Sequence, residues 1–187
     1  EEDCHIAFDP LGLVLAAATV NGVVELFDVR SMDAGPFKRW QLGGLPVDPP
    51  SWCSIEFSPN GQYILLSTYA SEVYLVDSFS GARLFEWKDR TNSTGQPIPA
   101  SFSPNSDRVI TGSTDGTIHV YDTQTGLKTD VLCSHDSEAP ILTRFHPNLP
   151  LVVSGGAHLN LWTTAENIPP ISTGSEVFHQ REMMDLS

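Results

Sequence analysis

Short apolar runs separated by turn residues recur along the whole chain, and within them apolar and polar side chains alternate with a period of two. The clearest are Val73–Val76 and Thr117–Tyr121, which are rich in β-branched and aromatic residues. Such runs are typical of β-strands, because successive side chains of a strand point to opposite faces. No segment of the sequence sustains the 3.6-residue period of a helix. We therefore predict an all-β protein.

The runs repeat in a fixed order. A Phe-x-Pro element recurs at spacings of 49, 45 and 43 residues, beginning at Phe8, Phe57, Phe102 and Phe145. A second apolar run follows each element, at Leu13–Ala18, Tyr63–Ser67, Arg108–Gly112 and Leu151–Ser154. A third run ends 19, 19, 19 and 17 residues after the Phe, at Phe27, Val76, Tyr121 and Trp162. Four strands in a unit of this length are typical of one blade of a β-propeller.

The turns between the runs repeat as well. An aspartate directly follows the third run in three units, at Asp28, Asp77 and Asp122, and a Ser/Thr-Gly pair comes shortly after Asp77 and Asp122. Glycine suits such turns because it tolerates a positive φ. The Asn21-Gly22 and Asp115-Gly116 pairs predict two-residue type I′ hairpins. An aspartate after an aromatic residue is a worn form of the Trp-Asp pair that names the WD repeat, so we predict a WD-repeat β-propeller.

The pattern weakens at the C-terminal end. We predict about four blades over residues 1–166 and a flexible tail over residues 167–187, because no convincing fourth strand follows Trp162. WD-repeat propellers commonly have seven blades and often close with a strand from the N-terminus. We therefore expect the chain to be the C-terminal part of a seven-blade ring. In the alternative, the tail folds back as the fourth strand of the last blade.

Charge and composition narrow the partners. The net charge is −13, from 23 acidic and 10 basic residues, and no basic run is present. Nucleic-acid binding depends on Lys and Arg displacing counterions from phosphates, so we expect no direct nucleic-acid partner. No apolar stretch is long enough to span a membrane, and no secretory signal precedes the repeats. The negative net charge favours basic protein segments as partners.

The cysteines predict neither a disulfide framework nor a metal site. There are three, without a Cys-x-x-Cys pair, which fits a reducing compartment such as the cytosol or nucleus. Cys4 and Cys53 both lie four residues before the Phe of their repeats, where the other repeats have Ile98 and Ile141. We expect both to be small hydrophobic core residues and predict no metal and no cofactor.

The search for catalytic motifs finds no constellation for an enzyme. The sequence contains no phosphate-binding Gly-Lys loop, no Gly-x-Ser-x-Gly elbow and no His-Glu-x-x-His. In WD repeats a His before the first strand often joins a structural hydrogen-bond network with a Ser or Thr and the Trp. We predict part of that network at His135, Ser154 and Trp162, a structural interpretation that leaves His135 without a catalytic role.

One stretch and several later strands resemble a particular family. The stretch Leu26–Phe37 contains Asp-Val-Arg-Ser and Ala-Gly-Pro-Phe, and matching strands follow in order at Ile55–Ser58, Ile64–Thr68, Ala100–Pro104, Gly112–Val120 and Leu159–Trp162. This order resembles the WD-repeat subunits of COMPASS-type histone lysine methyltransferase complexes. The resemblance implies a non-catalytic nuclear scaffold at transcribed chromatin. Its implied partners are methyltransferase-complex subunits and RNA-processing or polymerase-associated factors.

The candidate partner-binding residues lie in the first long connector. They are Arg30, Asp33, Pro36 and Phe37, because loops on a rigid scaffold commonly carry recognition. The alternative is that they form only a structural connector. A second functional hypothesis also starts here: Phe27-Asp28-Val29-Arg30 resembles the Trp-Asp-x-Arg box with which substrate receptors of cullin-type ubiquitin ligases contact an adaptor.

Overall fold

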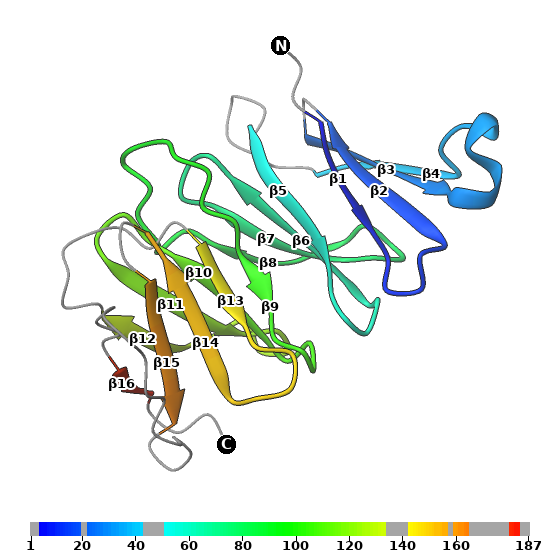
Figure 1. Ribbon diagram of the computed structural model, residues 1–187. Helices are drawn as coiled ribbons and strands as arrows, with labels where there is room; N and C mark the ends of the chain where they lie inside the picture. Colours follow the sequence, from blue (N-terminus) through cyan, green and yellow to red (C-terminus); the bar gives the residue numbers. More distant parts are fainter. Residues whose placement is uncertain are drawn as a thin grey trace.

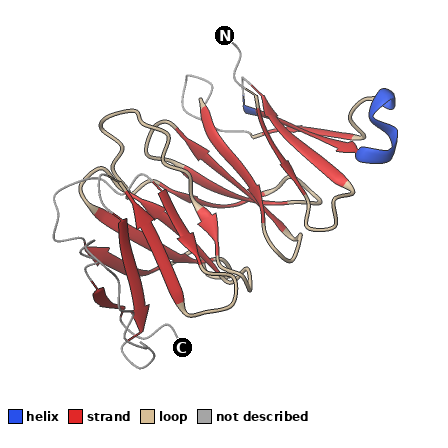
Figure 2. Ribbon diagram, viewed as in Figure 1, coloured by secondary structure: helices blue, strands red, loops and turns tan. Residues whose placement is uncertain are grey.

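Four four-stranded β-sheets follow one another along the chain, antiparallel except for the last strand of the fourth sheet, and they confirm the predicted fold class (Figure 1). The computed structural model describes residues 4–19, 22–42, 51–133, 142–156, 159–164 and 180–183. Within them the one helical element with assigned bounds is a short 3-10 helix, η2, at Val29–Ala34. Figure 2 shows how completely strands dominate, and how η2 stands at the outer side of the first sheet.

The sheets are named 1 to 4 in chain order. Sheet 1 contains β1 (His5–Phe8), β2 (Val14–Thr19), β3 (Val23–Asp28) and β4 (Lys38–Gln41). Sheet 2 contains β5 (Trp52–Phe57), β6 (Tyr63–Thr68), β7 (Val73–Asp77) and β8 (Arg83–Trp87). Sheet 3 contains β9 (Ser101–Phe102), β10 (Arg108–Gly112), β11 (Thr117–Asp122) and β12 (Lys128–Cys133). Sheet 4 contains β13 (Leu142–Phe145), β14 (Leu151–Gly155), β15 (Leu159–Thr164) and β16 (Gln180–Met183).

The core lies between successive sheets, because each sheet turns one face to the sheet before it and the other to the sheet after it. At the joint of sheets 1 and 2, small aliphatic residues of sheet 1 pack against larger residues of sheet 2. The sheet 1 side holds Ala16, Ala18, Val24 and Leu26, and the sheet 2 side holds Phe57, Ile64, Leu66, Tyr74 and Val76. The period-two alternation of the sequence thus separates two buried faces rather than a buried face from a wet one.

The repeated aspartates hold the turns that the sequence predicts. Asp77 Oδ1 accepts the backbone N–H groups of Phe79 and Ser80 at 3.2 and 2.6 Å. Asp122 Oδ1 accepts those of Gln124 and Thr125 at 3.0 and 2.7 Å. The glycine that follows each turn has a positive φ, 77° at Gly81 and 71° at Gly126. The carboxylates therefore replace solvent as acceptors for the turn, which is why Asp recurs at this position.

The hairpin between β10 and β11 differs from the predicted type I′ turn. Gly116 has a φ of 87°, but Asp115 does not have the positive φ that a type I′ turn requires. Ser113 donates its N–H to the Thr117 carbonyl at 2.9 Å, so three residues form the loop. Asp115 instead accepts from the backbone and hydroxyl of Thr117 at 3.0 and 2.6 Å. The same residues make a longer turn, because the aspartate side chain bonds forward along the strand. In the other predicted hairpin, Asn21 lies outside the described residues.

The fourth strand of sheet 4 comes from the C-terminal segment. Gln180–Met183 pairs with β15 in a parallel orientation, from Leu161 opposite Gln180 to Thr164 opposite Met183. This position corresponds to the alternative in which the tail folds back onto the last blade. The boundary expected near residue 166 and most of the predicted tail lie outside the described residues. The division into blades and tail, and the seven-blade ring, stay predictions.

The two equivalent cysteines have different environments. Cys53 is buried and its thiol donates to the Thr68 carbonyl at 3.3 Å, while burial raises the pKa of the thiol. Cys4 is exposed and precedes β1, so the expectation of a core position for it is wrong. Arg90 and Ile98, in the connector that follows β8, act on the Cys53 thiol. The corresponding connector after β4 lies mostly outside the described residues.

Candidate functional site

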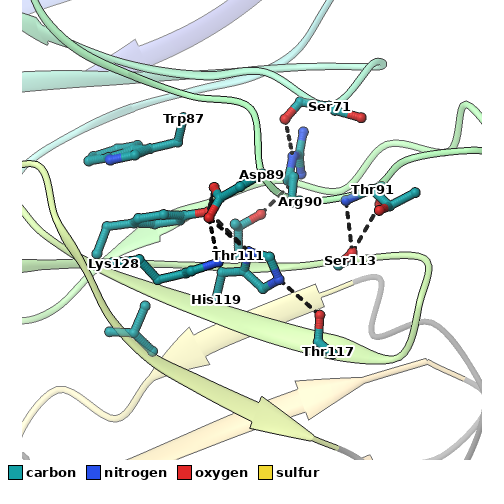
Figure 3. A network of polar contacts seen from close by, with 12 residues as sticks. Ser71, Trp87, Asp89, Arg90, Thr91, Thr111, Ser113, Thr117, His119 and Lys128 are labelled. Carbon is teal, nitrogen blue, oxygen red and sulfur yellow. Dashed lines mark hydrogen bonds and ion pairs between the residues drawn. The ribbon is translucent and has the colours of Figure 1, made fainter.

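The connector between sheets 2 and 3 carries a buried arginine that sequence reasoning missed. Arg90 is only 2% exposed, and five hydrogen bonds surround its guanidinium. Nε donates to the Ser71 carbonyl at 3.1 Å, and Nη2 donates to the carbonyls of Thr68 at 3.0 Å and Ala70 at 3.2 Å. Nη1 donates to the Ile98 carbonyl at 2.7 Å and to Thr111 Oγ1 at 3.0 Å. Figure 3 shows Arg90 beside Ser71, with Thr111 of β10 on its other side.

The acceptors of Arg90 are all neutral oxygens. Burial therefore lowers the pKa of the guanidinium, although an arginine, whose ordinary pKa is very high, stays protonated. A buried charge is tolerated when its hydrogen-bonding groups are matched, and the five donors of Arg90 meet five acceptors. The result is a clamp that joins the β6–β7 hairpin, the end of the connector and β10.

Asp89 binds the neighbouring sheet beside this clamp. Its carboxylate accepts from the Tyr121 hydroxyl at 2.5 Å and from Lys128 Nζ at 2.5 Å. Burial alone would raise the pKa of Asp89, but the bonds from Lys128 and Tyr121 outweigh it and lower that pKa. Trp87, two residues earlier, stacks on the Tyr121 ring with 4.6 Å between centroids and donates Nε1–H to the Gly126 carbonyl at 2.8 Å.

A row of alternating side chains on β11 continues the network. His119 lies within hydrogen-bonding distance of Tyr121 Oη, 3.1 Å from Nδ1, and of Thr117 Oγ1, 2.9 Å from Nε2. Thr117 in turn donates to Asp115. Burial lowers the pKa of His119, and the positive charge of Lys128 adds to that shift. Burial, then the bond to Asp89, raises the pKa of Tyr121. The lowered pKa keeps the imidazole neutral, so one ring nitrogen donates to one of the two hydroxyl oxygens.

The next residues pin the exposed part of the connector. Thr91 and Ser113 bond twice, from Thr91 N–H to Ser113 Oγ at 2.9 Å and from that hydroxyl to the Thr91 carbonyl at 3.2 Å. Asn92 Nδ2 donates to the carbonyls of Tyr69 at 2.7 Å and Gln96 at 2.8 Å. Both amide hydrogens of Asn92 are thus used within the chain. The exposed residues 93–97 form a solvent-facing loop on a fixed base.

The predicted partner-binding residues lie elsewhere, in the β3–β4 connection. Arg30, Asp33, Pro36 and Phe37 are all exposed. The Arg30 guanidinium binds Asp28 through two bonds, Nε to Oδ1 at 3.0 Å and Nη2 to Oδ2 at 2.8 Å. The Arg30 side chain lowers the pKa of Asp28 to about 2. The same carboxylate accepts the Arg30 N–H and so begins η2. A role for these four residues in partner binding stays a prediction.

The predicted network in the last blade is only partly within the described residues. Trp162 Nε1 donates to Ser154 Oγ at 2.8 Å across β14 and β15, and both side chains are buried. His135 lies outside the described residues, so the three-residue network stays a prediction. Among the residues that can be assessed, no three His, Cys, Asp or Glu side chains are grouped to hold a metal ion. No helix in the described part is long and apolar enough to cross a membrane.

Comparison with known proteins identifies the repeat. The family described as WD domain, G-beta repeat matches residues 100–122, which include β9, β10 and β11. The chain is built from WD repeats. The family match therefore coincides with the sheet to which the Arg90 clamp and the Asp89 network bind.

Several curated proteins are similar over most of this WD-repeat chain. WD repeat-containing protein 82 of Drosophila melanogaster is 37% identical over 83% of the chain and 49% of its own length. Protein ANTHESIS POMOTING FACTOR 1 of Arabidopsis thaliana is 38% identical over 62% of the chain and 34% of its own length. COMPASS component SWD2 of Saccharomyces cerevisiae is 24% identical over 86% of the chain and 52% of its own length. The chain spans about half, or less, of the length of these relatives.

Proposed function

We propose that this chain acts as a non-catalytic WD-repeat scaffold in a COMPASS-type histone lysine methyltransferase complex. The observation that carries the proposal is its similarity, over 86% of the chain, to a protein named as a COMPASS component. A role in protein-protein contacts at transcribed chromatin would place the protein in the nucleus. Its partners would be subunits of that complex, with RNA-processing or polymerase-associated factors as further partners.

The geometry supports a scaffold more than an enzyme. The polar clusters of the described residues are satisfied inside the fold: Arg90 by five acceptors, and Asp89 by Tyr121 and Lys128. His119 has hydroxyl partners on both ring nitrogens, and neither hydroxyl belongs to an activated nucleophile with an oxyanion site beside it. These contacts join two blades and present a fixed loop at residues 93–97, as a rigid binding platform requires.

Affinity capture from nuclear extract tests this proposal. The tagged chain should recover methyltransferase-complex subunits, and the eluate should methylate histone substrate although the purified chain alone does not. Replacement of three exposed loop residues, Ser93→Ala, Thr94→Ala and Gln96→Ala, tests the platform. The matched control is Leu127→Ala, in an exposed turn of sheet 3. Recovery of no complex subunit by a folded wild-type chain would contradict the proposed function.

The alternative function, a substrate receptor of a cullin-type ubiquitin ligase, depends on Arg30 and is tested separately. This side chain is 73% exposed and is held at the surface by Asp28, so it is available to an adaptor. Arg30→Ala should abolish binding of a cullin adaptor and leave methyltransferase binding intact if the chain is a substrate receptor. Equal capture of the adaptor by wild type and variant would remove this alternative.

A further inference from the structure

Five side chains of sheet 3 and the connector before it form one continuous row of hydrogen bonds along β11. Asp89 Oδ1 lies 2.5 Å from Tyr121 Oη, which in turn lies 3.1 Å from His119 Nδ1. On the other side of the ring, His119 Nε2 lies 2.9 Å from Thr117 Oγ1 (Figure 3), and that hydroxyl lies 2.6 Å from Asp115 Oδ1. A carboxylate thus stands at each end of the row, with two hydroxyl groups and one imidazole between them.

The Asp89 end of the row fixes the tautomer of the imidazole. Although burial alone would raise the pKa of Asp89, the bonds that it receives lower that pKa, so the carboxylate is ionised and can only accept hydrogen bonds. Tyr121 has a single hydroxyl hydrogen and donates it to Asp89. The Tyr121 oxygen therefore accepts from the imidazole, which places the hydrogen of a neutral His119 on Nδ1.

The Asp115 end of the row has one hydrogen too few. Although burial alone would raise the pKa of Asp115, the bonds from Thr117 lower that pKa, so this carboxylate also only accepts. With its hydrogen on Nδ1, neutral His119 has a lone pair on Nε2, which is a second acceptor beside Thr117. The single hydroxyl hydrogen of Thr117 therefore has two acceptors, at 2.6 and 2.9 Å. Only a second ring proton, on Nε2, gives every contact of the row both a donor and an acceptor.

Burial and one neighbouring charge oppose that second proton. His119 is 4% exposed, and burial lowers its pKa most, followed by the charge of Lys128 on β12. Asp89 of the connector and Asp115 of the hairpin raise that pKa, while Arg90 lowers it further. Asp89 is itself paired with Lys128 at 2.5 Å, which weakens its support for a charged ring. The ring is therefore neutral at neutral pH, and its second proton requires a lower pH than an exposed histidine does.

The two acceptors that compete for the Thr117 hydroxyl differ in their access to water. Asp115 is exposed and can replace a lost donor by water, whereas the imidazole is buried and cannot. With a neutral ring, the Thr117 hydroxyl therefore donates to Nε2. With a charged ring, Nε2–H is itself a donor, and the same hydroxyl turns to Asp115.

We propose that His119 is a proton-operated switch for the β10–β11 hairpin, residues 113–116. In both states the Asp115 carboxylate retains the backbone N–H of Thr117, at 3.0 Å. One ring proton leaves the remaining acceptor position of Asp115 open to a donor from water or from a partner. Two ring protons close that position with the Thr117 hydroxyl.

The switch acts beside the fixed loop at residues 93–97. The hairpin is part of the base of that loop, because Thr114 Oγ1 donates to the Thr91 carbonyl at 3.0 Å. The exposed carboxylate of Asp115 is therefore available next to the loop at neutral pH and is withdrawn in acid. This regulation goes beyond the proposed scaffold function and does not depend on which complex the chain joins.

Nitrogen-15 NMR of the imidazole tests the tautomer and the switch. At pH 7.5 His119 should carry its hydrogen on Nδ1, and Nε2 should take up the second proton as the pH falls. The carboxyl carbon-13 signal of Asp115 should show a step at the midpoint of the His119 titration, in addition to its own titration at lower pH. A hydrogen on Nε2 at pH 7.5, or a ring that takes up no second proton before the chain unfolds, would overturn the proposal.

Thr117→Val separates the hydroxyl relay from electrostatic coupling through space. Valine keeps the shape of threonine without the hydroxyl, so Asp115 should lose most of its step at the His119 midpoint while the ring still titrates. The matched control is Thr129→Val on β12, whose exposed hydroxyl donates to the Val120 carbonyl and which should leave the step as in wild type. His119→Gln should abolish the step. A step of full size in Thr117→Val would show that charge alone couples the two groups and would contradict the switch.

Discussion

An arginine and a glycine with positive φ occur both at the joint between sheets 2 and 3 and on the outer side of sheet 1. They are packed at the joint and exposed on the outer side. At the joint, Arg90 is buried and its five donors bind neutral oxygens of three chain segments. On the outer side of sheet 1, Arg30 stays in solvent and binds Asp28 two residues away. A positive φ glycine, Gly126, lies against the Phe85 ring at the joint, whereas Gly12 of sheet 1 has open space around it.

This difference shows where the inter-blade geometry is specified. A local pair such as Asp28 and Arg30 fixes one turn and little else, because solvent would serve both groups almost as well. Arg90 instead satisfies buried acceptors of Thr68, Ile98 and Thr111, so the two sheets and their connector must keep their relative positions. Substitutions at the joint should therefore destabilise the fold, whereas substitutions on the outer side of sheet 1 should be tolerated.

Replacing the two arginines by methionine should give the largest contrast. Arg90→Met leaves several buried carbonyls without a donor, each at about 1–3 kcal/mol, so we expect unfolding free energy to fall by about 3 kcal/mol or more. Arg30→Met should leave the unfolding free energy nearly unchanged, as is usual for an exposed side chain. Urea unfolding measured by fluorescence compares the two, and near-equal effects would show that the clamp does not hold the joint.

Two glycines with matched backbones give the next contrast. Gly126 and Gly12 have φ values of 71° and 69°, but a Cβ at Gly126 would lie 2.2 Å from the Phe85 ring while none lies within 4 Å at Gly12. Both alanine variants bear the left-handed penalty of about 1–2 kcal/mol. Gly126→Ala should also displace Phe85 and cost about 1–3 kcal/mol more. Equal melting temperatures for the two variants would contradict this close packing.

The smallest expected effect is a pH dependence from His119. Its pKa lies below the ordinary value because of burial, so the unfolded chain binds a proton that the folded chain resists. The resulting stability is complete above the ordinary histidine pKa and declines as pH falls through it, toward the lowered pKa. Urea unfolding at pH 7.5 and 5.5 should show a smaller loss in His119→Gln than in wild type. An identical loss would remove His119 as the cause.

The repeat was readable from sequence because it is local. The Phe-x-Pro elements, the alternating runs and the Asp-x-x-Gly turns each act within a few residues, and the strands β2, β6, β10 and β14 lie where the apolar runs predict them. The Arg90 clamp was not readable, since its acceptors come from residues 68–71, 98 and 111 and four of the five are backbone carbonyls. Every residue has a backbone carbonyl, so the identity of a side chain does not show which carbonyl will accept a hydrogen bond.

The candidate site divides in the same way. Arg30, Asp33, Pro36 and Phe37 drew attention because they form a recognisable string, and the structure places them on an exposed connection. The fixed loop at residues 93–97 contains no comparable string, and its order depends on Asn92 and Ser113 binding carbonyls and amides elsewhere. Arg90 directly follows Lys88 and Asp89 in the sequence, so nothing there distinguishes it from an exposed charged residue.

The amino-acid sequence by itself determined the strands, their turns and their grouping into four-stranded units, because alternation, glycine conformation and aspartate capping are properties of neighbouring residues. Only the tertiary structure decided which faces are covered. Phe8 and Phe57 occupy the same repeat position, yet one is exposed and the other buried, because burial depends on whether a second sheet packs there. Cys4 and Cys53 also share a repeat position and differ in burial. The alternation of side chains in the sequence determines which face of a sheet a residue lies on. Whether that face is buried depends on what packs against it.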